Sequence, residues 1–311
     1  MGKRLAGRVA VVTGAGRGIG RATAELLGAE GAAVVVNDLG GNMDGSGQAA
    51  QVADEVVAAI KAKGGTAIAN YDSVADFTAA GNIVDTAVRE FGRIDILVNN
   101  AGILRDRMVF NMSEAEWDAV IAVHLQGAFN CTRHASAQMR QQRHGRIISM
   151  ASTSGVFGNS GQANYGAAKD GIAAMTRVIA RDLGRYGITA NAVCPAAATR
   201  MTESVGDAAR AKRAARGIAG PGGAVAVQYK LEHMGPENVA PWVVYLATDA
   251  CAHVNGEVFV AMGGMVGLLN YPAPVRTISK GGRWTPEEIA AVFSRTLGMD
   301  LVNPAPAQDA G

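Results

Sequence analysis

The sequence is poor in cysteine and in aromatic residues, and neither sign of charge predominates. Its three cysteines, Cys131, Cys194 and Cys251, are widely spaced, which fits neither a disulfide framework nor a zinc site with CxxC spacing. Lysine and arginine total 29 against 27 acidic residues, so the composition gives no electrostatic reason to expect nucleic acid or a membrane as the main partner. No apolar run is long enough to cross a bilayer. We therefore expect a protein of the reducing cytoplasm that acts on a small molecule and binds no metal.

Apolar residues, by contrast, make up 49% of the 311 residues, which is enough for a substantial core. Short β-branched runs alternate with alanine-rich segments of helical length. The runs lie at residues 9–13, 33–36, 94–100, 146–150 and 187–193, and two of the helical segments lie at 20–29 and 117–140. This alternation predicts crossover units and a parallel sheet that is buried on both faces. We expect an α/β fold with a single doubly wound parallel sheet of the Rossmann type, flanked by helices, over residues 1–267.

Two segments do not follow this alternation. Residues 202–234 are rich in alanine, glycine and arginine, which favours a mobile loop or a helical flap. Residues 268–311 are expected to form a C-terminal extension, whose one firm element is predicted at 284–297. There Thr285 is suited to cap a helix and Pro286 to take its first position.

A glycine-rich turn, TGAGRGIG at residues 13–20, follows the first expected strand and opens the first expected helix. Gly14 permits the turn, Gly18 allows a phosphate to approach the backbone, and Gly20 allows close packing. The amide groups at the helix start are suited to bind a pyrophosphate. Alone, such a loop is equally compatible with an ordinary turn, but its position between strand and helix favours a dinucleotide site.

Asp38 stands directly after the second expected strand, where a carboxylate can accept hydrogen bonds from both hydroxyl groups of an adenosine ribose. That carboxylate would repel a 2′-phosphate, so it predicts NAD rather than NADP. Arg17 argues for NADP, because a guanidinium in the glycine loop can pair with the phosphate. We favour NAD because the charge of Asp38 would lie closer to the phosphate. The alternative for Asp38 is a solvated aspartate of a turn.

Tyr165 and Lys169 are four residues apart in NYGAAKDG and therefore share one face of a helix. Ser152 precedes the tyrosine by thirteen residues and follows the strand expected at 146–150. A phenol, an ammonium and a hydroxyl group can thus converge at the carboxyl end of a parallel sheet, where ligands of such folds bind. An isolated YxxxK is more typical of a surface helix, so the order of the motifs carries the interpretation.

Together with NNAG at residues 99–102, these motifs resemble the short-chain dehydrogenase/reductase family over nearly the whole chain to about residue 267. A narrower resemblance is carried by VVVNDLGG, ANYDSV, NNAGILRDR and VHLQGAF. These segments are similar to the D-specific 3-hydroxyacyl-CoA dehydrogenase domains of peroxisomal multifunctional enzymes, also called 17β-hydroxysteroid dehydrogenase type 4, and to their bacterial stand-alone relatives.

The family resemblance implies a mechanism. Tyr165 would take the hydroxyl proton while hydride leaves the same carbon for the nicotinamide. Lowering a phenol pKa from near 10 to about 7 needs roughly 4 kcal/mol, of which one ammonium about 5 Å away supplies roughly 3 kcal/mol at an effective dielectric near 20. Lys169 would supply that charge and hold the nicotinamide ribose, and Ser152 would bond the substrate oxygen. His124, where many members have asparagine, would support a water-linked proton relay; the alternative is a buried histidine satisfied by a neighbour.

The resemblance also assigns further residues to the cofactor. Asp72 is expected to receive the adenine amino group, Thr199 to contact the carboxamide, and Ile19 to pack near the pyrophosphate. For Asp72 and Thr199 a turn or cap role is the alternative. The other residues expected beside the cofactor are Ser73, Asn99, Ala101, Gly102 and Pro195. The chain departs from the family where the usual proline-glycine pair reads Pro195 and Ala196, which leaves the loop conformation there open.

For the substrate, the resemblance implies oxidation of a (3R)-hydroxyacyl-CoA to the 3-oxoacyl-CoA, with a steroid-derived acyl chain within its scope. The alternatives are a 3-oxoacyl-carrier-protein reductase, a hydroxysteroid dehydrogenase and, from another class, a catalytically silent NAD-sensing scaffold. Lys212, Arg213 and Arg216 in the flap would meet the coenzyme A phosphates or simply form a solvated helix face. A homodimer or homotetramer is expected from the resemblance alone.

Overall fold

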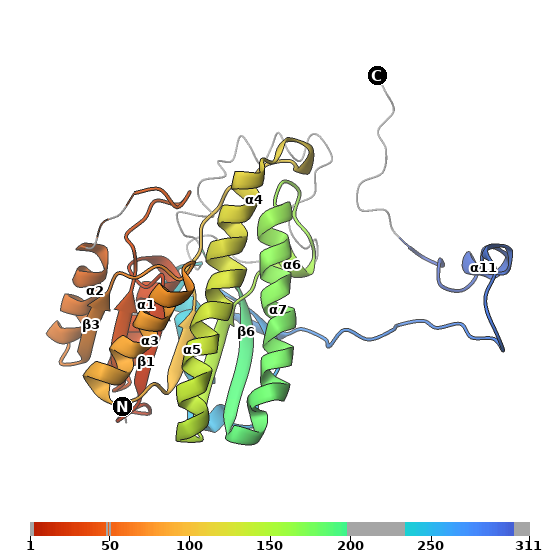
Figure 1. Ribbon diagram of the computed structural model, residues 1–311. Coiled ribbons are helices and arrows are strands. Elements are labelled where there is room, and N and C mark those ends of the chain that lie inside the picture. Colours follow the sequence, from red (N-terminus) through yellow and green to blue (C-terminus); the bar gives the residue numbers. More distant parts are fainter. Residues whose placement is uncertain (1–2, 48, 50, 198–233, 302–311) are drawn as a thin grey trace.

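The computed structural model describes residues 3–47, 49, 51–197 and 234–301. Their main body is one central sheet that is covered by helices on both faces (Figure 1). The sheet has eight strands in the order β3-β2-β1-β4-β5-β6-β7-β8. The strands are β1 (Val9–Thr13), β2 (Ala33–Asn37), β3 (Thr66–Asn70), β4 (Ile96–Asn99), β5 (Gly145–Met150), β6 (Ile188–Ala196), β7 (Val258–Met262) and β8 (Met265–Leu268). All neighbouring pairs are parallel except β7 and β8, which are antiparallel.

The main helices fall into two layers. Those of one face are α1 (Gly18–Ala29), α2 (Gln51–Ala62) and α10 (Ala240–Leu246), and those of the other are α3 (Phe77–Phe91), α5 (Gly127–Gln142) and α7 (Ala163–Leu183). Shorter elements complete the top of the molecule: α4 (Glu114–Ile121), α6 (Thr153–Val156) and the 3₁₀ turn Val109–Asn111. The predicted doubly wound α/β fold is therefore confirmed.

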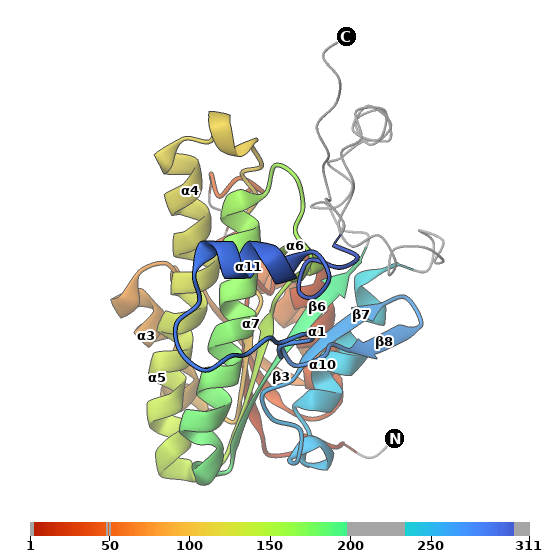
Figure 2. The same ribbon diagram turned by 90° about the vertical axis from the view of Figure 1, so that its right-hand side faces the viewer.

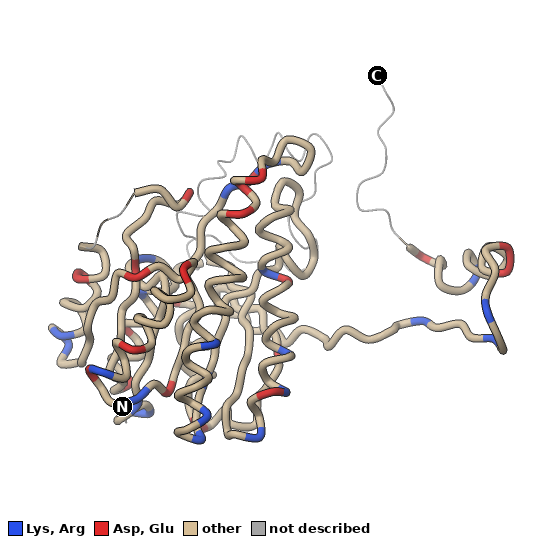
Figure 3. Tube along the Cα trace, viewed as in Figure 1, with Lys and Arg blue, Asp and Glu red and all other residues tan. Residues whose placement is uncertain are grey.

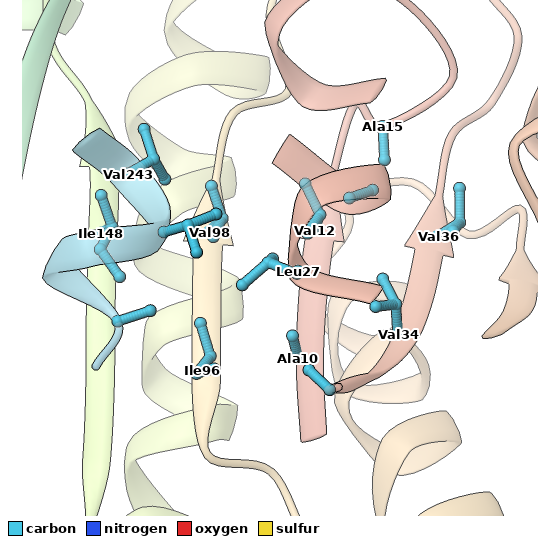
Figure 4. Close-up of a cluster of buried hydrophobic side chains, with 14 of the residues drawn as sticks. Ala10, Val12, Ala15, Leu27, Val34, Val36, Ile96, Val98, Ile148 and Val243 are labelled. Carbon is cyan, nitrogen blue, oxygen red and sulfur yellow. The ribbon is translucent and has the colours of Figure 1, made fainter. Parts of the chain in front are cut away.

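Alternate residues of the strands explain why both faces are covered. Ala10 and Val12 of β1 pack in one buried cluster with Leu27 of α1 and Val243 of α10, which Figure 4 shows between the sheet and these two helices. Val9 and Val11, the residues that alternate with them, pack in a second cluster against α3, α5 and α7. Successive side chains of a strand point to opposite faces, so a run that is apolar throughout needs a cover on each side.

Each strand predicted from a β-branched run is present, with ends shifted by a few residues. The runs did not reveal β3, β7 and β8, because TAIAN is short and alanine-rich and because the strands after the flap follow no clear helical segment. The sheet is parallel as expected, and only its edge strand β8 departs from this direction. β8 follows β7 after a tight turn, and such a connection allows only antiparallel pairing.

Two predicted helices differ in detail. The segment expected at 117–140 begins at Glu114, and its middle, Ala122–Gln126, is a π-helical turn between α4 and α5. In the C-terminal extension, α11 (Pro286–Phe293) begins as predicted, with Thr285 accepting from the Glu288 backbone and Glu288 bonding back. Figure 1 shows α11 apart from the sheet and its helices, at the end of an extended segment, and in the turned view of Figure 2 it lies in front of α7. The flap expected at 202–234 lies outside the described residues except for Met234.

The order of the strands places the site. β1 is followed along the chain by β2 on one side, whereas β4 lies on its other side, so the direction of the winding changes between β1 and β4. Ligands of open α/β sheets bind at the carboxyl ends of the strands at such a point. The glycine turn, Asp38 and the NNAG segment all follow strands there.

Lysine, arginine and acidic side chains are interspersed along the described chain (Figure 3). None of the described helices has both the length and the hydropathy to span a membrane.

Candidate active site

The glycine turn between β1 and α1 has the geometry of a dinucleotide cradle. Gly14 and Gly18 have φ values of +61° and +54°, a region in which residues with a side chain are strained. A Cβ on Gly20 would lie 2.2 Å from the Gly14 carbonyl oxygen, so the helix packs against the turn only with glycine there. Within the described part of the chain no side chain caps the start of α1, so its amide groups are available to an anion. These residues fit a pyrophosphate.

Asp38 anchors the loop that follows β2. Its two carboxylate oxygens accept from the Gly16 amide at 2.7 Å and from the Gly40 amide at 2.6 Å. Each oxygen retains a lone pair, so the carboxylate can also accept from ribose hydroxyl groups. Gly16 was not among the predicted site residues, yet a Cβ there would come within 2.8 Å of the carboxylate. Among the described residues, the side chain of Arg17 makes one long bond, at 3.5 Å, from Nη1 to the Gly41 carbonyl oxygen.

Asn100 holds the glycine turn in place and was missed by the sequence analysis. Its Nδ2 donates to the carbonyl groups of Thr13 at 3.0 Å and Gly14 at 2.9 Å. The Thr13 hydroxyl in turn accepts from the backbone amides of Asn100 and Ala101. The NNAG motif therefore fixes the turn from the end of the neighbouring strand β4, and the second asparagine of the motif was the sequence signal for this role.

The other residues assigned to the cofactor lie around the same edge of the sheet. Asp72 follows β3 and accepts at 2.8 Å from Asn70 Nδ2, and the Ser73 hydroxyl accepts from the Ala75 amide, so both have local roles in the turn. Ile19 packs partly buried against the core. Pro195 lies in β6, paired with Ala261, and Thr199 lies outside the described residues.

Ser152, Tyr165 and Lys169 are brought together as expected. The tyrosine and lysine lie one turn apart near the start of α7, and Ser152 follows β5 and caps α6 by accepting from the Ser154 amide at 3.1 Å. Lys169 Nζ lies 5.6 Å from the centre of the Tyr165 ring and donates to the Met150 carbonyl at 2.6 Å. A phenol, an amine and a hydroxyl group thus lie close together at the carboxyl end of the sheet.

Burial shifts the pKa values of Tyr165 and Lys169 in the directions that favour their neutral forms. It raises the pKa of Tyr165 to about 12, against the opposing effect of its hydrogen bond with Ser152. It lowers the pKa of Lys169 to about 8. The pKa of Tyr165 is therefore not lowered as expected from Lys169, because burial, which penalises the phenolate, has the largest effect on it.

His124 lies in the π-helical turn, buried, with its ring edge-on to that of Tyr165 and the ring centres 5.2 Å apart. Its Nε2 contacts the backbone nitrogen and oxygen of Ile103 at 3.0 and 2.8 Å. Burial, and to a lesser degree the charge of Lys169, lowers the pKa of His124 to about 3, so the ring is neutral at physiological pH. π-Helical turns are frequent at functional sites because they displace one side chain from the regular helix.

Asn99 and His124 line a small cavity of about 10 Å³ together with Lys169. A cavity of this size is at the lower limit of what can hold one water molecule. Asn99 Oδ1 and His124 Nδ1 are buried and have no hydrogen-bond partner among the described residues. The Nδ2 of Asn99 donates instead to Thr132 and Ser149, so its side chain joins β4 to α5 and β5. Gly102 passes close to the histidine, since a Cβ there would lie 2.3 Å from His124 Cε1.

The sequence of this chain matches the short chain dehydrogenase family over residues 8–210. The chain belongs to this family. It is 43% identical to the hydroxyacyl-CoA dehydrogenase ChsB1 of Mycobacterium tuberculosis over 93% of this chain and 88% of that protein. Among solved structures, a short chain dehydrogenase from Mycobacterium avium has a TM-score of 0.79 at 43% identity, covering 98% of this chain and 99% of that one.

Two other relatives carry different names. The chain is 42% identical to peroxisomal multifunctional enzyme type 2 of Mus musculus over 92% of its own length, but it spans only 36% of that enzyme. It is 43% identical to the 3-oxoacyl-[acyl-carrier-protein] reductase of Synechocystis over 84% of this chain and 98% of the relative. This short-chain dehydrogenase is thus an oxidoreductase that acts on CH–OH groups with an NAD(P) nucleotide.

Proposed function

We propose that this short-chain dehydrogenase oxidises a (3R)-hydroxyacyl-CoA to the 3-oxoacyl-CoA with NAD. The observation that carries the proposal is the convergence of Ser152, Tyr165 and Lys169 at the carboxyl end of β5, in a chain similar to a hydroxyacyl-CoA dehydrogenase over 93% of its length. The scope includes a steroid-derived acyl chain. A catalytically silent scaffold would have no use for this complete set of polar groups.

Each residue of the site has a separate role in the proposed reaction. Tyr165 accepts the proton of the substrate hydroxyl group as the C–H bond of the same carbon breaks and the carbonyl group forms. Ser152 donates a hydrogen bond to the oxygen, which positions it for this transfer. When bound, the nicotinamide supplies the acceptor for the hydride. Lys169 would hold the nicotinamide ribose and would favour the phenolate by its charge. His124 and Asn99 line the small cavity beside Lys169, and we assign these two residues to a proton relay from the lysine.

Asp38 and the glycines at 14, 18 and 20 would hold the nucleotide, with Asp38 on the adenosine ribose. The preference for NAD rests on this carboxylate, whose two oxygens are fixed by the Gly16 and Gly40 amides. A negatively charged group in a fixed position cannot turn away from a 2′-phosphate. The cytoplasm is the compartment we propose, in keeping with three buried cysteines that form no disulfide.

The test is nicotinamide reduction by the purified protein with NAD, comparing (3R)- and (3S)-hydroxyacyl-CoA of several chain lengths, with Tyr165→Phe as the control. Turnover restricted to the R series and lost in the variant supports the proposal. Turnover of free hydroxysteroids but of no thioester would contradict it.

The second candidate is reduction of a 3-oxoacyl group on an acyl carrier protein, which the Synechocystis relative favours. The two candidates differ in nucleotide and in thioester carrier. Comparing kcat/KM for NADPH with the carrier-protein thioester against that for NADH with the CoA thioester decides between them.

We further propose that the protein is a homodimer or homotetramer. α5 and α7 expose apolar side chains on their outer faces, Phe129 at 44% and Val178 at 56%. On α11, which stands apart from the body of the molecule (Figure 1), Ile289 and Phe293 are likewise exposed. Deleting residues 284–297 and measuring the mass in solution tests whether α11 covers a neighbouring subunit, and an unchanged oligomer would reject that role.

A further inference from the structure

The loop that follows β2, residues 38–47, is hydrogen-bonded to residues 104 and 105, which lie in a segment that also contacts the residues around Tyr165. We name residues 38–47 the adenosine-side loop and residues 103–107 the bridge segment. The Leu104 amide donates to the Met43 carbonyl at 2.8 Å, and Arg105 Nε donates to the Asp44 carbonyl at 2.9 Å. The two segments are about sixty residues apart in sequence, so the fold and not the local chain brings them together.

The adenosine-side loop is bonded within itself and fixed at its start. The Asn42 amide donates to the Ser46 carbonyl at 2.7 Å and the Gly45 amide to the Asn42 carbonyl at 3.0 Å. Gly45 has φ of +85°, and a Cβ there would come within 3.2 Å of the Ile103 side chain. Asp38 ties the start of the loop to the glycine turn through Gly16. A ligand held by Asp38 would therefore act on the loop as a unit.

The bridge segment also contacts His124 and the start of α7, which carries Tyr165. Ile103 contacts His124 Nε2 with its backbone. Asn164, whose side chain is fully buried, donates from Nδ2 to the Arg105 carbonyl at 3.0 Å and to the Glu116 carbonyl at 3.0 Å. Its Oδ1 accepts at 2.7 Å from the backbone amide of Tyr165. The residue before the tyrosine thus fixes the start of α7 to the bridge segment.

We propose that Arg105 and Asn164 are positioning residues through which occupancy of the adenosine end orders the segment that carries Tyr165. The inference rests on the proposed nucleotide site at Asp38. When a ligand fixes the adenosine-side loop, the bonds at Leu104 and Arg105 open less often, and the bridge segment with Asn164 becomes less mobile. Coupling of this kind needs no change in the average structure, because the first ligand removes motion that the second end would otherwise have to lose.

The alternative role for the Arg105 side chain is electrostatic attraction of a negatively charged substrate. Two of its N–H groups are already directed to backbone carbonyl groups, those of Asp44 and Ala115, from Nε and Nη1. A lysine would keep the charge but lose this planar fork. Arg105→Lys should therefore behave like Arg105→Ala if Arg105 positions the bridge segment, and like the wild type if only its charge matters.

Amide hydrogen exchange with adenosine monophosphate tests the proposal without turnover. This probe lacks the nicotinamide half, so it contacts only the adenosine end. In the wild type we expect it to slow exchange in the adenosine-side loop and also, several-fold, at Leu104 and Tyr165. In Arg105→Ala and Arg105→Lys, amide exchange should slow in the adenosine-side loop but not at Leu104 and Tyr165. Arg107→Ala is the matched control, because Arg107 lies in the same segment but pairs with Glu116 of α4, and it should resemble the wild type.

Kinetics provides the second readout. With NAD and an alcohol substrate, Arg105→Ala and Arg105→Lys should lower kcat several-fold and leave the Kd for adenosine monophosphate nearly unchanged. Slowing at Tyr165 that persists in Arg105→Ala, slowing confined to the loop in the wild type, or full kcat in Arg105→Lys would each overturn the inference. Absence of any slowing in the loop would remove the nucleotide site at Asp38 and the inference with it.

Discussion

Replacing Lys169 by methionine should stabilise the folded protein while it abolishes catalysis. Lys169 is 4% exposed, and burial lowers its pKa from 10.5 to about 8. This displacement corresponds to about 3 kcal/mol by which burying the ammonium destabilises the folded state at neutral pH. Methionine also loses the bond from Nζ to the Met150 carbonyl, which offsets about 1 kcal/mol of the gain. We expect a free energy of unfolding about 2 kcal/mol higher for Lys169→Met at pH 7.

The dependence on pH gives the prediction its sign. Below a pH of about 8 the lysine is protonated in both the folded and the unfolded chain, so the folded state carries the full penalty. Between about 8 and 10.5 only the unfolded chain keeps the proton, so the stability contributed by this group rises with pH and the penalty disappears. The advantage of Lys169→Met should therefore be present at pH 7 and lost near pH 10.5.

Urea unfolding of the nucleotide-free proteins at both pH values measures the difference. Lys63→Met is the matched control, because Lys63 is 63% exposed and paired with Glu25, and its replacement should change stability by less than about 0.5 kcal/mol. A Lys169→Met variant that is no more stable than the wild type at pH 7 would refute the reasoning. So would an advantage that persists undiminished at high pH.

Three further outcomes are expected. Asp38→Asn should raise the NADP:NAD ratio of kcat/KM about a hundredfold, since unit charges about 5 Å apart repel by roughly 3 kcal/mol at an effective dielectric near 20. Asp95 is buried; burial opposes the effect of its hydrogen bonds from His144 and Arg93, which lower its pKa to about 2. Asp95→Asn should cost about 2 kcal/mol in urea unfolding at pH 7, and the difference should shrink as the pH falls from about 4 to about 2. Thr285→Ala should weaken α11 by about 1 kcal/mol, seen as roughly fivefold faster amide exchange over residues 286–293.

The parts of the site that the sequence predicted depend on local spacing. Gly14, Gly18 and Gly20 are needed by a turn of a few residues, and Tyr165 and Lys169 share a helix face whatever surrounds the helix. The capping of α11 by Thr285 is equally local. Local rules of this kind hold once the element forms, so the fold class and the meeting of Ser152 with Tyr165 followed from the order of the motifs.

The parts that the sequence did not predict depend on contacts between distant segments. Asn100 bonds the glycine turn and Asn164 bonds the bridge segment, and an asparagine gives no sign of its partner until the fold is known. The π-helical turn that directs His124 inward has no spacing rule of its own. The antiparallel pairing of β8 likewise depends on a turn geometry that its short run MVGL does not specify.

Burial in this site has opposite effects on stability and on catalysis. Both Tyr165 and Lys169 are held where their charged forms are disfavoured, with pKa values of about 12 and about 8. A phenolate formed in such surroundings has little water to screen it, so any positive charge brought close to it acts strongly. The protein alone therefore keeps Tyr165 protonated and inactive as a base, and only a complete site, with oxidised nucleotide and ordered α7, would favour proton transfer. An adenosine end that also orders Tyr165 through Arg105 and Asn164 would make that completion depend on the whole nucleotide rather than on its nicotinamide alone.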